Sequence, residues 1–269
     1  MKKVLLFVNP LKATRLAQEV IRKLEGQGIE TSVFAGEKIR SVDAAVSLGG
    51  DGTVLFTART VSQHKVPILP VNLGTLGFIA AIPPDEWRTI FDDFLNGRTV
   101  FSRRLMLDAR VQRGTETVFQ SVCLNDAIIS ASAVAKMIRL NVHTGNASIG
   151  TYRSDGLIAA TPTGSTAYSV SAGGPILDPE MEAVIINPIC PFTLSSRPLV
   201  LPSNDEIVIE VEREQRSGVS LTMDGQTTEQ LQPGDRIVIH RAKEDALLAC
   251  QDSIKSAFYN ALRTKLAWK

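Results

Sequence analysis

The stretch "AAVSLGGDGTVLFTARTV", residues 44–61, joins an apolar run to a helix-forming segment through three glycines that surround one aspartate, Asp51. The apolar run has the length and composition of a buried strand. Glycine permits sharp turns and close approaches of the backbone, so the cluster predicts a tight turn around Asp51. We expect Thr53 to cap a helix that then continues to about residue 62.

The first third of the chain repeats this order of strand and helix. Apolar residues at helical spacing follow the first strand, and prolines and a glycine frame the last helix. Alternating strands and helices predict a parallel sheet that helices cover on both faces. We expect strands at residues 4–8, 31–34, 44–48 and 66–72, and helices at 16–24, 53–62 and 85–97.

After residue 97 the pattern changes to short β-rich segments separated by turn residues, which predicts an all-β, sandwich-like domain. At the end of the chain, Ile254, Phe258, Leu262 and Leu266 recur at helical spacing. They predict an amphipathic helix that returns to the first domain. The sequence therefore predicts an α/β domain over residues 1–98, an all-β domain over 99–250, and a helix within 251–269.

The charge and the cysteines of the chain limit what it binds. The 269 residues carry a formal net charge of +1, and no apolar run is long enough to span a bilayer. The three cysteines and three histidines are scattered, without a CxxC pair. We therefore expect a cytoplasmic protein with no nucleic-acid partner, no membrane partner and no metal site built from its side chains.

Asp51 has two interpretations. Its side chain either closes an Asx-type turn or acts on a ligand. The turn is neither a Walker A loop, because no Gly-Lys-Ser/Thr follows, nor a GxGxxG motif. A strand that ends in glycines and opens a helix suits an anion such as phosphate. Its expected place at the carboxyl end of a parallel strand favours a ligand, because such sheets bind ligands there.

A second unusual stretch is "TPTGSTAYSVSAGGPI", residues 161–176. Its hydroxyls suit a polar, sugar-like ligand, and Tyr168 offers a flat face on which a base can stack. Ser165 or Thr166 is expected to cap a short helix. The alternative is a Ser/Thr-rich surface loop, but the apolar runs on both sides favour a constrained segment.

Two further groups of polar residues interrupt apolar runs. Asn125 and Asp126 fall inside "CLNDAIIS", where burying an unsatisfied amide costs roughly 2–7 kcal/mol. This pair either ends the strand in a turn or binds a ligand. Arg153 and Asp155 lead into Gly156, and Asp155-Gly156 is also a common hairpin turn.

These motifs together, in this order, resemble the NAD kinase family. The matching text is "GGDGT" at 49–53, "LND" at 124–126, "SDGLIAATPTGSTAYSVSAGGPI" at 154–176 and "MDGQ" at 223–226. GGDGT alone is also similar to lipid kinases and phosphofructokinases, whereas the long threonine-rich segment is far more specific to NAD kinases. The family's architecture, an α/β domain followed by an all-β domain, agrees with the pattern described above.

The resemblance implies that Asp51 is the general base that accepts the proton of the adenosine ribose 2′-hydroxyl, with Gly52 leaving room for the substrate. It implies that Asn125 and Asp126 hold the ribose and adenine, and that Asp155, with Arg153 close by, contacts the nicotinamide end. Asp126 stands where the family often has the longer glutamate. The other implied dinucleotide contacts are Lys136, Thr166, Ala167, Tyr168, Ser169, Val170, Ser171 and Gln226.

By resemblance the ligands are NAD and ATP, or another phosphoryl donor, with a divalent cation, Mg²⁺, carried by the triphosphate. The resemblance also implies a homodimer or homotetramer in which a neighbouring subunit completes the dinucleotide pocket. Two alternatives remain: a GGDGT-type lipid kinase, and a non-catalytic NAD(P) sensor that uses the same pocket.

Overall fold

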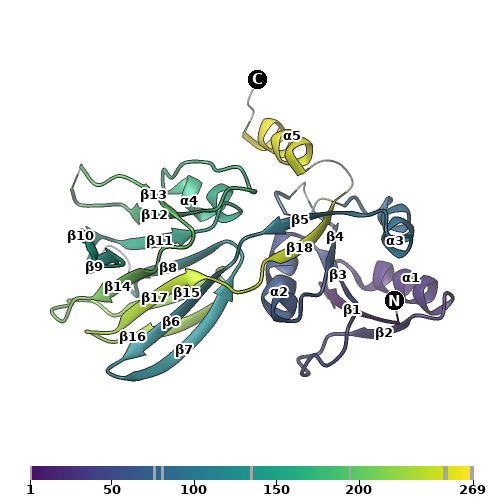
Figure 1. Cartoon of the computed structure of the whole chain (residues 1–269), viewed down its shortest axis with the longest axis horizontal. Coiled ribbons are helices and arrows are strands. Elements are labelled where there is room, and N and C mark those ends of the chain that lie inside the picture. Colours follow the sequence, from purple (N-terminus) through teal and green to yellow (C-terminus); the bar gives the residue numbers. More distant parts are fainter. Residues whose placement is uncertain are drawn as a thin grey trace. The chain divides into compact units, whose positions relative to one another are not determined.

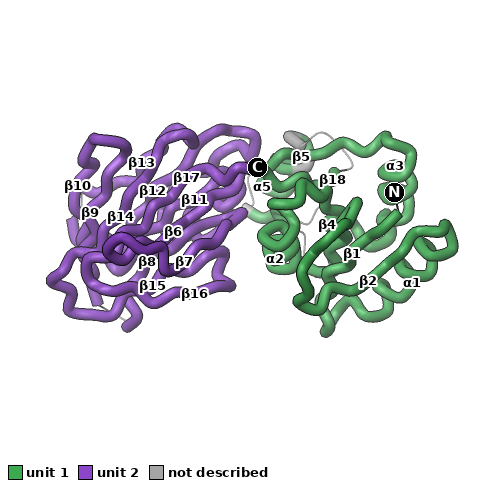
Figure 2. The backbone as a smooth tube through the Cα atoms, turned by 60° about the horizontal axis from the view of Figure 1, so that its bottom comes forward, with its two compact units in different colours: residues 1–104, 244–269 green, residues 105–243 purple. Residues whose placement is uncertain are grey.

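The computed structural model describes residues 2–74, 77–79, 82–133, 136–193, 195–250 and 254–266. Its contacts divide the chain into two compact units, which Figure 2 colours separately. Unit 1 holds residues 1–104 and 244–269, and unit 2 holds residues 105–243. The chain therefore leaves unit 1 and later returns to it.

Unit 1 is built on one six-stranded sheet in the order β2-β1-β3-β4-β18-β5 (Figure 1). All neighbouring strands pair in parallel except β18 and β5, which are antiparallel. The expected parallel sheet is thus present, with one antiparallel edge strand. The strands are β1 Lys3–Val8, β2 Glu30–Val33, β3 Ala44–Gly49, β4 Ile68–Asn72, β5 Val100–Arg104 and β18 Ala246–Cys250.

Helices cover both faces of this sheet. Val4 and Leu6 of β1 belong to a buried cluster that also holds side chains of α1 and α3. Phe7 points to the opposite face, where its ring lies 5.9 Å from that of Phe56 in α2. This alternation follows from the two-residue repeat of a strand. The helices are α1 Thr14–Glu25, α2 Asp51–Val61, α3 Trp87–Leu95 and α5 Ile254–Leu266, with a 3₁₀ turn at Ser62–His64.

Unit 2 consists of two six-stranded antiparallel sheets, in the orders β10-β9-β14-β17-β6-β7 and β13-β12-β11-β8-β15-β16. Two short helices, η2 Gly164–Thr166 and α4 Tyr168–Ser171, lie between β11 and β12. The strands are β6 Leu107–Arg113, β7 Glu116–Cys123, β8 Asp126–Ala131, β9 Ile138–Thr144, β10 Ala147–Ser154, β11 Gly156–Ala160, β12 Ala183–Ile189, β13 Leu199–Pro202, β14 Ile207–Val211, β15 Val219–Met223, β16 Thr227–Leu231 and β17 Arg236–Arg241.

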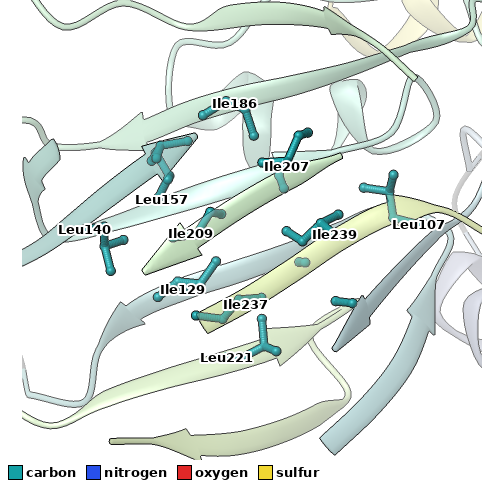
Figure 3. Close-up of a cluster of buried hydrophobic side chains, with 14 of the residues drawn as sticks. Leu107, Ile129, Leu140, Leu157, Ile186, Ile207, Ile209, Leu221, Ile237 and Ile239 are labelled. Carbon is teal, nitrogen blue, oxygen red and sulfur yellow. The ribbon is translucent and has the colours of Figure 1, made fainter. Parts of the chain in front are cut away.

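Alternate side chains of both sheets form the core of unit 2. Figure 3 shows Leu140 and Ile209 of the first sheet in one cluster with Ile129 and Leu157 of the second. The second sheet is also covered on its other face, where Ile158 packs with Leu177 of the β11–β12 connection. The threonine-rich stretch is therefore held against a buried sheet face.

The division of the chain differs from the expected boundaries. Residues 100–104 and 246–250 form β5 and β18 of the unit 1 sheet, although the sequence placed them in the all-β domain. Strand propensity does not say which sheet a strand joins, because the partner strands are distant in sequence. The terminal helix α5 belongs to unit 1 and buries Phe258 and Leu262. Residues 251–253 and 267–269, and the side chains of Ile254 and Leu266, lie outside the described residues.

Among the described helices, none combines the length and hydrophobicity that crossing a bilayer requires.

Candidate active site

Asp51 stands at the carboxyl end of β3, where the chain turns into α2. The backbone ladder of β1 and β3 reaches this edge, since the N–H of Asn9 donates to the carbonyl of Leu48 at 2.9 Å. β2 pairs with one side of β1 and β3 with the other, so the direction in which strands are added to the sheet reverses between β1 and β3. Open α/β sheets bind ligands at such a switch point, so Asp51 has the predicted position.

The turn before α2 depends on glycine for a steric reason. A Cβ on Gly49 would lie 2.1 Å from the hydroxyl oxygen of Thr53, which leaves no room for a side chain. Gly50 is the N-cap, and Asp51 is the first residue of the helix. The expectation that Thr53 caps the helix is therefore wrong, because the helix begins two residues earlier and Thr53 lies inside its first turn.

The carboxylate of Asp51 is held by the backbone of a distant loop. The N–H of Phe78 donates to Oδ2 at 3.0 Å, and the N–H of Ile79 approaches Oδ1 at 3.3 Å. Gly77 comes so close that a Cβ there would lie 1.9 Å from Oδ1. The side chain of Asp51 is partly exposed. An oriented, accessible carboxylate at a helix N-terminus can accept a proton from a substrate hydroxyl.

Two cavities of unit 1, of about 410 and 360 Å³, lie elsewhere. The first is lined by α3 and the start of β5, and the second by the connection between β2 and β3, and Asp51 lines neither. The switch-point geometry of Asp51 is the stronger indication of a reactive site, because cavity size alone carries no chemistry.

Asn125 and Asp126 lie where the chain crosses from β7 in one sheet to β8 in the other. Both residues are buried. The pair therefore interrupts the run because it joins two strands of different sheets, which agrees with the turn that the sequence allowed. The backbone N–H groups of both residues donate to the carboxylate of Asp224, at 2.7 Å and 3.3 Å.

Among the described residues, one side-chain oxygen of this turn lacks a partner, and the carboxyl of the turn has a raised pKa. Oδ1 of Asn125 is buried and has no hydrogen bond within the described part of the chain. Burial, and secondly the charge of Asp224, raise the pKa of the Asp126 carboxyl to about 7. A buried amide oxygen and a carboxyl near neutrality are the groups expected where a ligand supplies the missing hydrogen bonds.

The threonine-rich segment packs on the same turn. The hydroxyl of Thr161 donates to the carbonyl of Leu124 at 2.6 Å, and its N–H donates to the carbonyl of Asn125 at 2.8 Å. Gly164 touches that backbone so closely that a Cβ would lie 2.1 Å from the carbonyl oxygen of Asn125. The structure thus brings residues 124–126 and the start of the predicted binding segment together.

Within residues 166–171 the side chains differ in accessibility. Tyr168 and Ser171 are exposed, and Thr166, Ala167 and Val170 are partly exposed. Ser169 is fully buried. The amide of Asn187 donates to the Ser169 carbonyl at 2.9 Å and to its hydroxyl at 3.3 Å, so this serine serves the packing of the segment.

Asp155 lies at the other end of the second sheet from Asp126, and Arg153 precedes it on β10 of the first sheet. In the pairing of β11 with β8, Gly156 is opposite Ser130, whereas Ala160 is opposite Asp126. Asp155 is five residues from Ala160, so at about 3.3 Å per residue it lies roughly 17 Å from Asp126 along the strand. The structure does not bring these two predicted contacts together within one subunit.

Asp155-Gly156 does not form the hairpin turn that the sequence left open as an alternative. The strand before it, β10, pairs with β9 in one sheet, and the strand after it, β11, pairs with β8 and β12 in the other. Asp155 therefore crosses between sheets. The guanidinium of Arg153 lies 4.8 Å from the ring centre of Phe192, an exposed aromatic residue.

The last two predicted contacts are exposed. Lys136 lies in the connection from β8 to β9, two residues before β9 begins. Gln226 closes the β15–β16 turn, where its N–H donates to the carbonyl of Met223 at 2.9 Å, two residues after Asp224. Sequence reasoning assigned no role to Asp224, Thr161 or Asn187. The signal for Asp224 was its Asp-Gly dipeptide between apolar runs, which predicts a turn but not its partner.

Two family models match the chain, and together they cover both units. The model described as the ATP-NAD kinase N-terminal domain matches residues 12–99, and that of the ATP-NAD kinase C-terminal domain matches residues 124–249.

Curated relatives are similar over the full length. A protein of Treponema denticola named NAD kinase is 41% identical, covering 100% of this chain and 97% of that protein. A Geobacter sulfurreducens protein of the same name is 38% identical, covering 100% and 99%.

Two solved structures share the fold at 24% sequence identity. Yeast NADH kinase in complex with NADH superposes with a TM-score of 0.92, covering 100% of this chain and 88% of that one. An NAD kinase from Archaeoglobus fulgidus in complex with ATP superposes with a TM-score of 0.79, covering 98% and 99%.

Proposed function

The chain belongs to the NAD kinase family and is a kinase, and on that premise we propose that it transfers the terminal phosphoryl group of ATP to the 2′-hydroxyl of the adenosine ribose of NAD, giving NADP. The observation that carries this proposal is the carboxylate of Asp51. It lies at the ligand-binding edge of the sheet, is accessible, and is oriented by the N–H groups of Phe78 and Ile79.

Asp51 acts as the general base in this reaction. An alcohol is a weak nucleophile at neutral pH, and a carboxylate within hydrogen-bond reach can take its proton as the new bond forms. The ribose oxygen then forms a bond to the γ-phosphorus, the bond from that phosphorus to the β,γ-bridging oxygen breaks, and ADP leaves. Beyond proton removal, such a transfer needs alignment and charge neutralisation.

A divalent cation belongs to the same proposal. Within the described residues, no group of three or more His, Cys, Asp or Glu side chains is placed to hold an ion. We propose that the cation arrives bound to the phosphates of ATP, as Mg²⁺ commonly does. When bound there, Mg²⁺ supplies neutralisation of the phosphate charge.

Unit 2 supplies most of the dinucleotide contacts in this proposal. Asn125 and Asp126 would hold the ribose and adenine, which is supported by the unpartnered amide oxygen and the raised pKa of the Asp126 carboxyl. Tyr168 is exposed and available to stack on a base. The remaining proposed contacts are Lys136, Arg153, Asp155, Thr166, Ala167, Val170, Ser171 and Gln226 of unit 2 and Gly52 of unit 1. Ser169, which is fully buried, serves the packing of the segment instead.

A homodimer or homotetramer completes the proposal. In this proposal Asp126 of one subunit holds the adenosine end of the dinucleotide, and the partner's Asp155 contacts its nicotinamide end. We propose the cytoplasm as the compartment. In the structure none of Cys123, Cys190 and Cys250 forms a disulfide, which agrees with that proposal.

The test is a coupled assay of the purified protein. NAD, ATP and Mg²⁺ are incubated with the enzyme, and NADP is detected by a dehydrogenase that accepts only the phosphorylated dinucleotide. We expect NADP that increases with time and enzyme concentration, and no product when ATP is omitted. An NADP yield no greater than that of a boiled sample would refute the proposed function.

A further inference from the structure

Asp224 lies at the tip of the hairpin that joins β15 to β16. Asp224 and Gly225 have positive φ angles of 52° and 65°, and the N–H of Gln226 donates to the carbonyl of Met223 at 2.9 Å. This is the pattern of a primed hairpin turn, which favours Asp-Gly. Although it belongs to a turn, Asp224 is 7% exposed. Its carboxylate is therefore directed into the protein, where a charge needs hydrogen bonds to be tolerated.

Three consecutive backbone N–H groups of another segment meet this carboxylate. The N–H of Leu124 donates to Oδ2 at 3.0 Å, and those of Asn125 and Asp126 donate to Oδ1 at 2.7 and 3.3 Å. In return, the N–H of Asp224 donates to the carbonyl of Asp126 at 2.9 Å. Hydrogen bonds to a charged group are about twice as strong as neutral ones, so this fork orients the turn strongly.

Thr161 donates hydrogen bonds to the carbonyl groups of the same turn. It donates to the carbonyl of Leu124 at 2.6 Å through its hydroxyl and to that of Asn125 at 2.8 Å through its N–H. Asp224 and Thr161 together thus engage every backbone N–H and carbonyl of residues 124–126. The Oδ1 atom of Asn125, by contrast, has no hydrogen-bond partner among the described residues.

We infer that Asp224 is the positioning residue of the dinucleotide site: by binding the backbone of residues 124–126 it directs the side chains of Asn125 and Asp126 toward the substrate. This inference rests on the proposed function, in which those two side chains bind NAD. Asp224 itself acts through the turn and makes no contact with substrate.

Asp224 also acts on Asp126 through its charge. Asp126 begins β8. Ala160 of β11 is opposite Asp126, and Met223 of β15 is opposite the next residue, Ala127. Neither Ala160 nor Met223 titrates. Asp224 is the charged group that, after burial, raises the pKa of Asp126. Asp224 therefore adds to the effect of burial in keeping a proton on Asp126 near neutral pH, and it contributes to a pH dependence of NAD binding.

The principal test is Asp224→Asn, which keeps the shape of the side chain but removes its charge and one acceptor. We expect the KM for NAD to rise roughly tenfold or more, because donors of the turn lose their partner and its side chains shift. The KM for ATP should change less than twofold. The apparent pKa in the pH profile of kcat/KM for NAD should move to lower pH, since the neighbouring negative charge is gone.

Asp235→Asn is the matched control. Asp235 is equally buried in unit 2, is paired with Arg113 at 2.8 Å and accepts the N–H of Gln232 in a turn at 2.7 Å. It should lower stability without altering the KM for NAD or its pH profile. If Asp224→Asn behaved as Asp235→Asn does, with only stability affected, Asp224 would be a structural residue and the inference would be overturned.

Amide hydrogen exchange tests the inference without catalysis. In the unliganded wild-type protein, the N–H groups of residues 124–126 should exchange slowly, and they should exchange faster in Asp224→Asn. Rapid exchange of these groups in the wild type would overturn the inference even if the variant failed to fold. Failure of the coupled assay would instead refute the proposed function and leave this exchange result standing.

Discussion

The carboxylate of Asp51 accepts a hydrogen bond of 3.0 Å from the backbone N–H of Phe78, 27 residues later in the chain. The glycine-rich turn places Asp51 at the edge of the sheet, but this bond sets the direction of its carboxylate. A general base must be held within a small range of positions to be effective. The loop of residues 77–79 is therefore part of the reactive site.

The first prediction concerns Gly77 in that loop. In Gly77→Ala the new Cβ would lie 1.9 Å from Oδ1 of Asp51, so the loop or the carboxylate must move. We expect kcat to fall on the order of 10- to 100-fold, as for other displacements of about 1 Å. Gly74→Ala is the control, because its Cβ would meet only Oδ1 of Asn72, at an ordinary 3.6 Å. Equal kcat values for the two variants would contradict the prediction.

The second prediction tests the base itself. Asp51→Asn should lower kcat by roughly 10²–10⁴-fold while the Kd for NAD stays within a few-fold, because an amide cannot accept the proton. Asp43→Asn is the matched control: its carboxylate also accepts two backbone N–H groups of unit 1, from Lys2 and Lys3. Rapid-quench kinetics and calorimetry give the two quantities. Near-wild-type turnover of Asp51→Asn would exclude this role.

The third prediction follows from the pKa of about 7 at Asp126, against an ordinary value of 3.8. A carboxyl whose folded pKa is raised binds more protons when folded, so its contribution to stability is lost as pH rises from about 4 to about 7. At about 1.4 kcal/mol per pKa unit the loss is on the order of 4 kcal/mol. Asp126→Asn should therefore raise the free energy of unfolding at pH 8 and change it little at pH 4.

Urea denaturation at both pH values measures this effect, and Asp235→Asn provides the contrast. That substitution breaks the pair with Arg113 and should destabilise the protein at pH 8, by about 3–5 kcal/mol for a fully buried pair and less here, where Arg113 is partly exposed. The same chemical change should thus have opposite signs at the two sites. Destabilisation by Asp126→Asn at pH 8 would show that burial does not raise the pKa of this carboxyl at the expense of stability.

The fourth prediction concerns Tyr168, which is 45% exposed at the start of α4. If its ring stacks on a base, Tyr168→Ala should weaken NAD binding by roughly 1–3 kcal/mol, and Tyr168→Phe should restore it. Tyr259→Ala removes a ring of similar exposure, 47%, and should leave the Kd unchanged. A calorimetric Kd for Tyr168→Ala equal to that of the wild type would assign Tyr168 to packing.

The fifth prediction tests the oligomer. Asn125→Ala and Asp155→Ala should each weaken NAD binding, but a mixture of the two refolded together should regain about a quarter of the wild-type sites if a dimer shares them. In such a dimer one site receives both intact residues, one of them the partner subunit's Asp155. A mixture no better than either variant alone would place both residues in sites within one subunit.

Local pattern was sufficient for the elements that carry Asp51. The apolar run of β3, the glycines after it and the helical spacing of α1 and α2 are properties of neighbouring residues, and the structure has these elements where they were expected, within two residues. The α/β and all-β parts were equally predictable, because apolar residues recur along the chain with a period near 3.6 in helices and 2 in strands. The start of α2 was misjudged by two residues, because glycine and threonine are about equally favourable at an N-cap and propensity does not decide between Gly50 and Thr53.

By itself, then, the sequence determined the two kinds of layer, the tight turn around Asp51 and, through its motifs, the family. Only the tertiary structure decided which sheet β5 and β18 join, that Asp155 crosses between sheets, and that Asp224 binds a turn 98 to 100 residues away. The reason is physical. Periodicity records which side of an element is buried, whereas these relationships are hydrogen bonds between segments that meet only when the sheets have formed.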